Sequence, residues 1–278
     1  MLKDRKMEKN DTKPNNKARQ YLSPRETEVI ARLGYEKVSL ITQEQFDRYF
    51  GFPKSIREKV IFRLKRKGIL NPVKRGVYFY SPLESGPAGS NINEFLVPPV
   101  FFPRSNYYIG YSTMYNYYGF TDQIFQKMYI LNTSLQREKT IGGMQFKMVK
   151  IPEKRMYGIE RIKIRDTEVS VSDRERTMVD LFYFPEPVGG LKTAFSILKE
   201  QAKSKKTDIT RLIKYTARFP NPSLRKRTGF ILEQAGVKDR ELEPLLKSIR
   251  KSSLVTLFPS KSRAGRINKK WKLIENAS

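Results

Sequence analysis

The chain has 278 residues, a length that suits two modest domains or one large one. It carries 55 Lys and Arg against 28 Asp and Glu, a formal net charge of +27, and has neither Cys nor His. Disulfides, thiolate or histidine metal sites, cysteine nucleophiles and Ser-His-Asp catalysis are therefore excluded. No apolar run spans a membrane and no signal-peptide block is seen, so the sequence predicts a cytoplasmic protein. At this charge the expected partner is a polyanion, most often nucleic acid.

The amino-terminal part of the chain begins with a polar segment and continues with helical patterns. Residues 1–22 are rich in Lys, Asn and Asp and nearly free of apolar side chains, which predicts a flexible basic arm. The run 23–26 is a capping box that begins a first helix, and Gly34 ends it. The run 42–45 is a second capping box, and its helix ends at Gly51.

A third helix and a β-hairpin complete the first predicted domain. The helix is expected over 53–67, and its buried face is expected to comprise Ile56, Val60, Ile61 and Leu64. Residues 73–80 predict a two-stranded hairpin. Three short helices followed by a hairpin predict a winged helix-turn-helix over 23–84, with the linker to the next domain at 81–90, where Pro and Gly concentrate.

The remaining residues, 85–278, predict a mixed α/β domain, so the fold class expected for the whole chain is α+β. Strands are expected at 128–132, 145–151, 161–165, 168–171, 254–258 and 271–274. Helices are expected after a capping box at 172–175 and over 191–203, 208–219, 222–235 and 243–251. The tyrosine-rich segment 107–118 favours a core or a protein interface over base stacking, because its rings recur at helical spacing with little local charge.

The third helix and the hairpin hold the densest charge: nine basic residues and one acidic residue in 53–75. In a winged helix the third helix enters the major groove and the wing lies against the backbone. The residues expected to contact DNA are Lys54, Ser55, Arg57, Glu58, Lys59, Phe62, Arg63 and Arg66 on the helix, and Lys74 and Arg75 at the wing. Lys54 and Ser55 reach base edges first, Arg57 and Arg63 suit phosphates, and Glu58 and Phe62 suit a cytosine amine and a thymine methyl or else pack locally.

A second concentration of charge lies near the carboxyl end, where residues 244–274 contain nine basic and no acidic side chains. A secondary basic surface is expected from Arg225, Lys226, Arg227, Lys261, Arg263, Arg266, Lys269 and Lys270. Such a surface suits the DNA backbone or an acidic protein partner, and a plain solvated tail is the alternative.

Catalytic patterns are poor. The chain contains no Glu-x-Lys pair of the kind that polynucleotide nucleases use, and Gly142-Gly143 is not followed by the Gly-Lys-Ser/Thr of a phosphate loop. Gly89-Ser90 lacks the paired carboxylates of a nucleotidyltransferase. The sequence therefore predicts a protein that is not an enzyme and uses no metal and no cofactor. A nuclease remains as a weaker hypothesis.

Several segments, in this order, resemble the AbiEi family of antitoxins and transcriptional regulators from bacterial abortive-infection (type IV toxin–antitoxin) systems. They are 73–78 (VKRGVY), 108–113 (YIGYST), 141–146 (IGGMQF), 171–181 (VSDRERTMVDL), 224–233 (LRKRTGFILE) and 265–273 (GRINKKWKL). The resemblance covers roughly residues 25–274.

The resemblance implies a DNA-binding repressor that controls its own operon. Its winged helix would bind inverted repeats in double-stranded DNA upstream of its gene, with two protomers per operator and the free protein a monomer or weak dimer. Its second domain would support repression and counter a nucleotidyltransferase-like toxin without a stable complex. The alternative is a module that binds a protein or RNA to counter the toxin, with DNA binding secondary.

Overall fold

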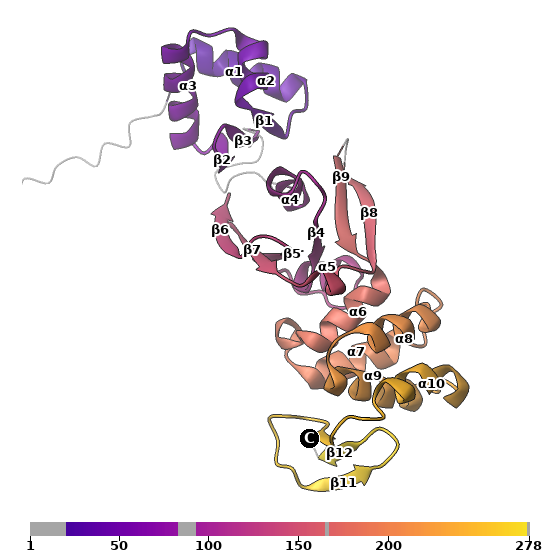
Figure 1. The fold of residues 1–278 in the computed structure, drawn as a ribbon. Helices are drawn as coiled ribbons and strands as arrows, with labels where there is room; N and C mark the ends of the chain where they lie inside the picture. The colour runs from indigo at the N-terminus through magenta and orange to yellow at the C-terminus, as the bar shows by residue number, and fades with distance from the viewer. Residues whose placement is uncertain (1–20, 83–92, 165–166, 277–278) are drawn as a thin grey trace, which may run out of the picture.

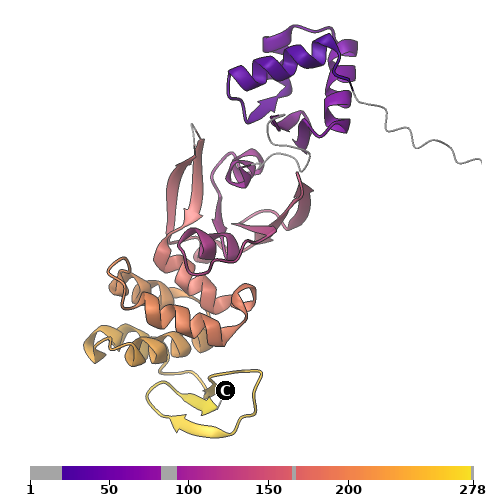
Figure 2. The same cartoon turned by 180° about the vertical axis from the view of Figure 1, so that it is seen from behind.

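The computed structural model describes residues 21–82, 93–164 and 167–276. Most of the predicted arm (1–22) and of the predicted linker (81–90) lies outside these residues. The described chain is mixed α+β, as predicted. Its parts follow one another in chain order along a long axis, with the first helices at one end and β11 and β12 at the other (Figures 1 and 2). Within the described part, no helix is both long enough and apolar enough to cross a membrane.

Residues 21–82 form three helices and a small antiparallel sheet with strand order β1-β3-β2. Their bounds are α1 Pro24–Tyr35, β1 Leu40–Thr42, α2 Gln43–Phe50, α3 Lys54–Arg66, β2 Leu70–Lys74 and β3 Val77–Tyr80. Both predicted capping boxes are present, at Ser23 and at Thr42. Gly51 ends α2 in the left-handed region, with φ of 56°, which favours glycine.

The burial of α3 follows its helical periodicity. Val60, Ile61 and Leu64 pack into the core of this unit with α1 and α2, while Ile56 is only partly buried. Strand β1 was not predicted, because three residues are too few to show a strand pattern. It is held in place by pairing with β3, a contact between segments far apart in the sequence.

Among the described residues, six strands form one mixed sheet with order β6-β7-β5-β4-β9-β8. Their bounds are β4 Tyr107–Gly110, β5 Lys127–Asn132, β6 Arg137–Ile141, β7 Met144–Lys150, β8 Ile159–Ile164 and β9 Thr167–Ser172. The four predicted strands in this region are confirmed within one or two residues. Strands β4 and β6 were missed. All four residues of β4 are buried, which removes the alternation that identifies a half-exposed strand, and β6 is mostly exposed.

Helices cover the sheet and continue beyond it. Their bounds are α4 Val97–Phe101, α5 Ser112–Tyr117, α6 Arg174–Tyr183, α7 Leu191–Gln201, α8 Ile209–Arg218, α9 Pro222–Gln234 and α10 Asp239–Ser248. A small sheet, β10 Val255–Thr256, β11 Gly265–Asn268 and β12 Leu273–Asn276, lies beyond them (Figure 1). The capping box predicted at 172–175 is wrong in detail. Asp173 is the N-cap of α6, and Glu175 instead accepts a hydrogen bond from the amide of Asp208.

The central sheet separates two apolar cores. In β4, Tyr107 and Ile109 point into the core beneath α4, and Tyr108 points into the core of helices α6–α10, because successive side chains of a strand face opposite sides. Tyr111 and Tyr115 belong to the second core, so the core interpretation of the tyrosine-rich segment is confirmed for them.

A buried polar cluster lies where the sheet meets the helices. The fully buried Arg176 and Asp180 form an ion pair with 3.1 Å between Nε and Oδ1, and Arg176 Nη2 donates to the Tyr108 hydroxyl at 2.7 Å. Arg155 Nη2 donates to the Tyr111 hydroxyl at 3.2 Å. Burial raises the pKa of both tyrosines. The cluster therefore joins β4 to α6: the neutral Tyr108 hydroxyl of β4 bonds to Arg176 of α6, which is paired with Asp180.

The hairpin β2–β3 is shared between the first unit and the rest of the chain. Leu70 and Tyr80 pack with α1 and α3. Val73, Val77 and Phe79 belong instead to the core beneath α4. Both faces of this hairpin are therefore covered by apolar contacts.

Candidate nucleic-acid interface

Helix α3 presents a polar, strongly basic face to solvent. Because Val60, Ile61 and Leu64 are buried, the intervening residues point outward. Exposed on this face are Lys54, Ser55, Glu58, Lys59, Phe62, Arg63, Lys65 and Arg66. Phe62 is unusual among them because a large apolar ring is 58% exposed. The Arg66 guanidinium lies 5.9 Å from the centre of that ring.

A hollow of about 430 Å³ separates α3 from the turn of the β2–β3 hairpin. Its lining residues come from α2, α3, the turn and β3: Gln43, Lys54, Arg57, Glu58, Ile61, Phe62, Lys65, Arg75 and Tyr78. The hairpin thus brings Arg75 to the same hollow as Lys54 and Lys65 of α3. Lys65 was not among the predicted contacts, although its place in the same charged run was visible in the sequence.

Most cations of this surface have no internal counter-charge. Lys54, Lys59, Arg63, Lys65, Arg66 and Arg75 form no ion pair with any residue that the structure describes. Cations gathered on one face without internal partners create a positive potential that attracts a polyanion. We name these six residues, with Ser55, Glu58 and Phe62, the α3 surface.

Arg57 differs from its neighbours. Its Nη1 donates to Oδ2 of Asp47 at 2.6 Å, and this hydrogen bond raises the pKa of Arg57. The pair connects α2 to α3, and the Arg57 side chain is only 13% exposed. Arg57 therefore supports the position of α3, and its contact with a phosphate stays a prediction.

Lys74 also differs from the prediction. Its ammonium donates to the backbone carbonyl of Val100 at 2.7 Å, at the end of α4. Lys74 lines a groove between the two units, whereas Arg75, the next residue, lines the hollow beside α3. The structure therefore places Lys74 at the contact between the units and Arg75 at the hollow beside α3.

A second lysine strengthens the contact between the units. The ammonium of Lys139, on β6, donates to the carbonyl of Val73 and lies 5.7 Å from the centre of the Phe101 ring. Desolvation lowers the pKa of Lys139. Together with Lys74 it bonds the hairpin to the neighbouring sheet and helix.

Four residues of the predicted secondary basic surface bond to other parts of the molecule. Arg225, Lys226 and Arg227 of α9 donate to backbone carbonyls of the segments that pack beside the helix. Burial lowers the pKa of all three. Lys270 forms ion pairs with Glu233 and Asp239. The predicted surface position is therefore wrong for Lys226, which is buried; Arg225 and Arg227 are partly buried, and Lys270 is exposed but ion-paired.

The other four predicted residues remain at the surface. Lys261, Arg263, Arg266 and Lys269 are exposed, and none of them forms an ion pair with a described residue. They lie on β11 and the segments beside it, at the opposite end of the molecule from α3 (Figure 1). We name these four residues the distal basic patch.

Comparisons with known proteins bear on the fold. No protein-family model matches the chain, and no curated protein matches its sequence. Among solved structures, the chain is similar to the crystal structure of the RV2827C protein from Mycobacterium tuberculosis, with a TM-score of 0.63 and 15% identity. The match covers 91% of this chain and 92% of that one. The two proteins therefore share an arrangement of elements over nearly their whole length.

Proposed function

We propose that residues 23–82 are a winged helix-turn-helix that binds double-stranded DNA. The order helix, strand, helix, helix and hairpin is the order of such a domain, with α3 as the recognition helix and the β2–β3 hairpin as the wing. The observation that carries the proposal is the α3 surface. Its six cations form no ion pair with a described residue, and Lys54 and Lys65 line the same hollow as Arg75 of the hairpin turn.

In this proposal the residues of the α3 surface divide between bases and backbone. Lys54 and Ser55 begin the helix and reach base edges first, while Glu58 suits the amine of cytosine and Phe62 a thymine methyl. Lys59, Arg63, Lys65 and Arg66 suit phosphates, and Arg75 of the wing suits a phosphate or the minor groove.

We further propose that this DNA binding is repression of the protein's own operon, as in the AbiEi family that the sequence resembles. Two protomers would occupy an inverted-repeat operator, with half-sites one helical turn or a multiple of it apart. The part from residue 93 onward would support repression and counter a nucleotidyltransferase-like toxin. The protein in this role is a cytoplasmic regulator and not an enzyme.

Fluorescence anisotropy tests the proposal with two duplexes of equal length at about 150 mM salt. One carries the DNA immediately upstream of the gene, and the other carries the same bases in scrambled order. We expect a preference of about a hundredfold, or about 2.7 kcal/mol, for the upstream duplex. With about six phosphate contacts, affinity should fall roughly a thousandfold between about 50 and 200 mM salt. Equal affinity for the two duplexes would contradict a sequence-reading repressor.

The distal basic patch favours a second candidate function, a module that binds a protein or RNA to counter the toxin. Its four cations lie far from α3, so they can be changed without altering the α3 surface. Reversal of Arg263, Arg266 and Lys269 to Glu separates the candidates in cells that carry the toxin. Lost protection with unchanged operator affinity would favour this function over repression alone.

A further inference from the structure

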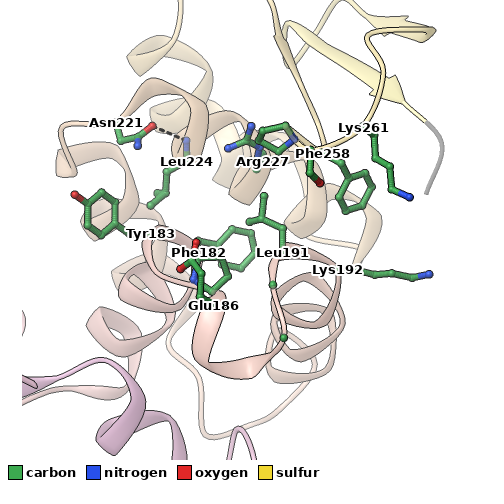
Figure 3. Close-up of a pocket in the computed structure, with 15 residues that line it drawn as sticks. Phe182, Tyr183, Glu186, Leu191, Lys192, Asn221, Leu224, Arg227, Phe258 and Lys261 are labelled. Atoms are coloured by element: carbon green, nitrogen blue, oxygen red, sulfur yellow. Dashed lines mark hydrogen bonds between the residues drawn. The ribbon is translucent and has the colours of Figure 1, made fainter. Parts of the chain in front are cut away.

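A cavity of about 510 Å³ lies among the helices of the second half of the molecule (Figure 3). Its walls come from the end of α6, the loop 185–190, the first turn of α7, the start of α9 and the segment 258–261. The volume is within the range of small-molecule sites. None of its lining residues belongs to the α3 surface or the interface between the units.

The cavity is positively charged. Lys192, Arg227 and Lys261 line it, and Glu186 is the one carboxylate among its lining residues. Lys192, Lys261 and Glu186 form no ion pair with any described residue. An anionic ligand would therefore meet three cations and displace no internal salt bridge.

Arg227 is the most constrained of these cations. Its Nε donates to the carbonyl of Leu257 and its Nη2 to the carbonyl of Thr256, each at 2.9 Å. Its Nη1 donates to no described residue, and no described carboxylate forms an ion pair with the guanidinium. A partly buried guanidinium that is held in place without a counter-ion is well prepared to bind an anion, because little side-chain freedom remains to be lost.

The opposite part of the cavity is aromatic and polar, with the carboxylate of Glu186 beside Phe182 (Figure 3). Tyr183 lies at one end with Asn221, while Lys192 and Lys261 lie at the other and Arg227 lies between (Figure 3). The Tyr183 ring covers the Arg155 guanidinium at 4.5 Å and is 44% exposed. The Asn221 side-chain oxygen accepts a hydrogen bond from the backbone N–H of Leu224. The amino group of the Asn221 side chain can therefore donate to a ligand.

At the charged end, two glycines expose the backbone to the cavity. Gly189 and Gly190 have φ of 90° and 101°, and no atom lies within 4 Å of where a side chain of Gly190 would begin. No side chain caps the amides of the first turn of α7, which begins at this wall. The cavity therefore joins an aromatic end to a cationic end with space between them.

We propose that this cavity binds a nucleotide, with the planar base against Tyr183 and Asn221 and the phosphates at Lys192, Arg227 and Lys261. A base stacks on an aromatic ring and accepts or donates hydrogen bonds at its edge, and phosphates prefer lysine and arginine. The site is distinct from the proposed DNA surface and does not depend on it.

Isothermal titration of the full chain with ATP at about 150 mM salt tests the charged end. We expect one saturable site, and at least a tenfold loss of affinity in the double variant Lys192→Glu, Lys261→Glu. The matched control is Lys206→Glu, Lys214→Glu, which changes the net charge equally at two exposed lysines outside the cavity. We expect it to alter affinity less than twofold. An equal loss in both variants, or no saturation up to about 1 mM ATP, would overturn the proposal.

Tripolyphosphate, which carries the charge without a base, tests the aromatic end. We expect it to bind at least tenfold more weakly than ATP. Tyr183→Ala should lower the affinity for ATP and leave that for tripolyphosphate unchanged. Tripolyphosphate binding as tightly as ATP would show that the cavity holds anions without recognising a base, and would refute a nucleotide site.

Discussion

Adjacent cations in this chain have different roles, and Lys74 and Arg75 are the clearest pair. Lys74 bonds to the carbonyl of Val100 in the neighbouring unit, and Arg75 lines the hollow beside α3. The sequence places both at the turn of a hairpin. Which side each one faces depends on what packs against the hairpin, and that is a property of the whole fold.

We expect Arg75→Ala to weaken DNA binding similarly for all sequences, because a phosphate contact carries no base information. The salt dependence of log affinity should become shallower by about one unit. The matched change Lys74→Ala should have the smaller effect on both quantities, since the Lys74 ammonium donates to the carbonyl of Val100 and lines a different groove from Arg75. Anisotropy titrations at several salt concentrations measure both variants, and a larger effect from Lys74 would contradict the assignment of Arg75 as the cation of the wing.

The same lesson applies to the run Arg225-Lys226-Arg227. Three consecutive cations on a helix indicate a charged surface when only composition is considered. Here each of them donates to backbone carbonyls of neighbouring segments, and Lys226 is fully buried. Every residue has a backbone carbonyl, so the sequence does not show which carbonyl accepts a hydrogen bond from a given cation. Sequence reasoning therefore could not separate these residues from the distal basic patch.

At the level of elements, helices were easier to predict than strands. Helix α2 has two local signals, the capping box at Thr42 and the glycine at its end, Gly51. Both lie within one short segment, so the sequence predicts the bounds of this helix. Strands β1 and β4 depend on partners far along the chain; β1 has only three residues, and β4 is buried throughout. Local signals therefore predicted most of the fold, and the missed elements, among them β1, β4, β6, α4 and α5, are short.

The packing of α9 on the small carboxyl-terminal sheet gives a test at this level. At Gly229 a Cβ atom would lie 2.0 Å from the ring of the buried Trp271. Gly229→Ala should therefore lower the free energy of unfolding by about 1 to 3 kcal/mol, the usual cost of overpacking a core. Urea unfolding followed by fluorescence measures it directly, since Trp271 is the single tryptophan of the chain.

The control for that variant is Gly34→Ala in α1. There the nearest atom to a new Cβ would be the Tyr80 hydroxyl, at an ordinary 3.5 Å. The change should be neutral or stabilising by up to about 1 kcal/mol, because alanine restricts the unfolded chain and fits a helix. Equal stability of the two variants would argue against the close packing of Trp271 on α9.

At the scale of the molecule, the proposed DNA-binding unit is joined to the rest by an apolar surface. Val73, Val77 and Phe79 of the hairpin lie in the core beneath α4, and Lys74 and Lys139 add hydrogen bonds around it. The orientation of the hairpin, and of Arg75 with it, is therefore set partly by the second unit.

We expect a fragment limited to residues 21–82 to associate or to lose the structure of its hairpin, because three apolar side chains become exposed. Analytical ultracentrifugation and amide exchange of β2 and β3 measure these effects against the full chain. The same fragment with Val73→Thr and Val77→Thr keeps β-branched residues in the strands and should be more monomeric. A monomeric unmodified fragment with protection equal to that of the full chain would contradict a structural role for this contact.

The amino-acid sequence alone determined the charge of the chain, the absence of thiol and imidazole chemistry, most helix bounds and the exposed face of α3. These properties depend on composition or on residues within a few positions of one another. The tertiary structure decided which cations are free, which bond to carbonyls or carboxylates, and that the hairpin is packed on both faces. Those outcomes depend on contacts between distant segments, such as Lys74 with Val100 and Lys270 with Glu233, and only the folded chain brings such groups together.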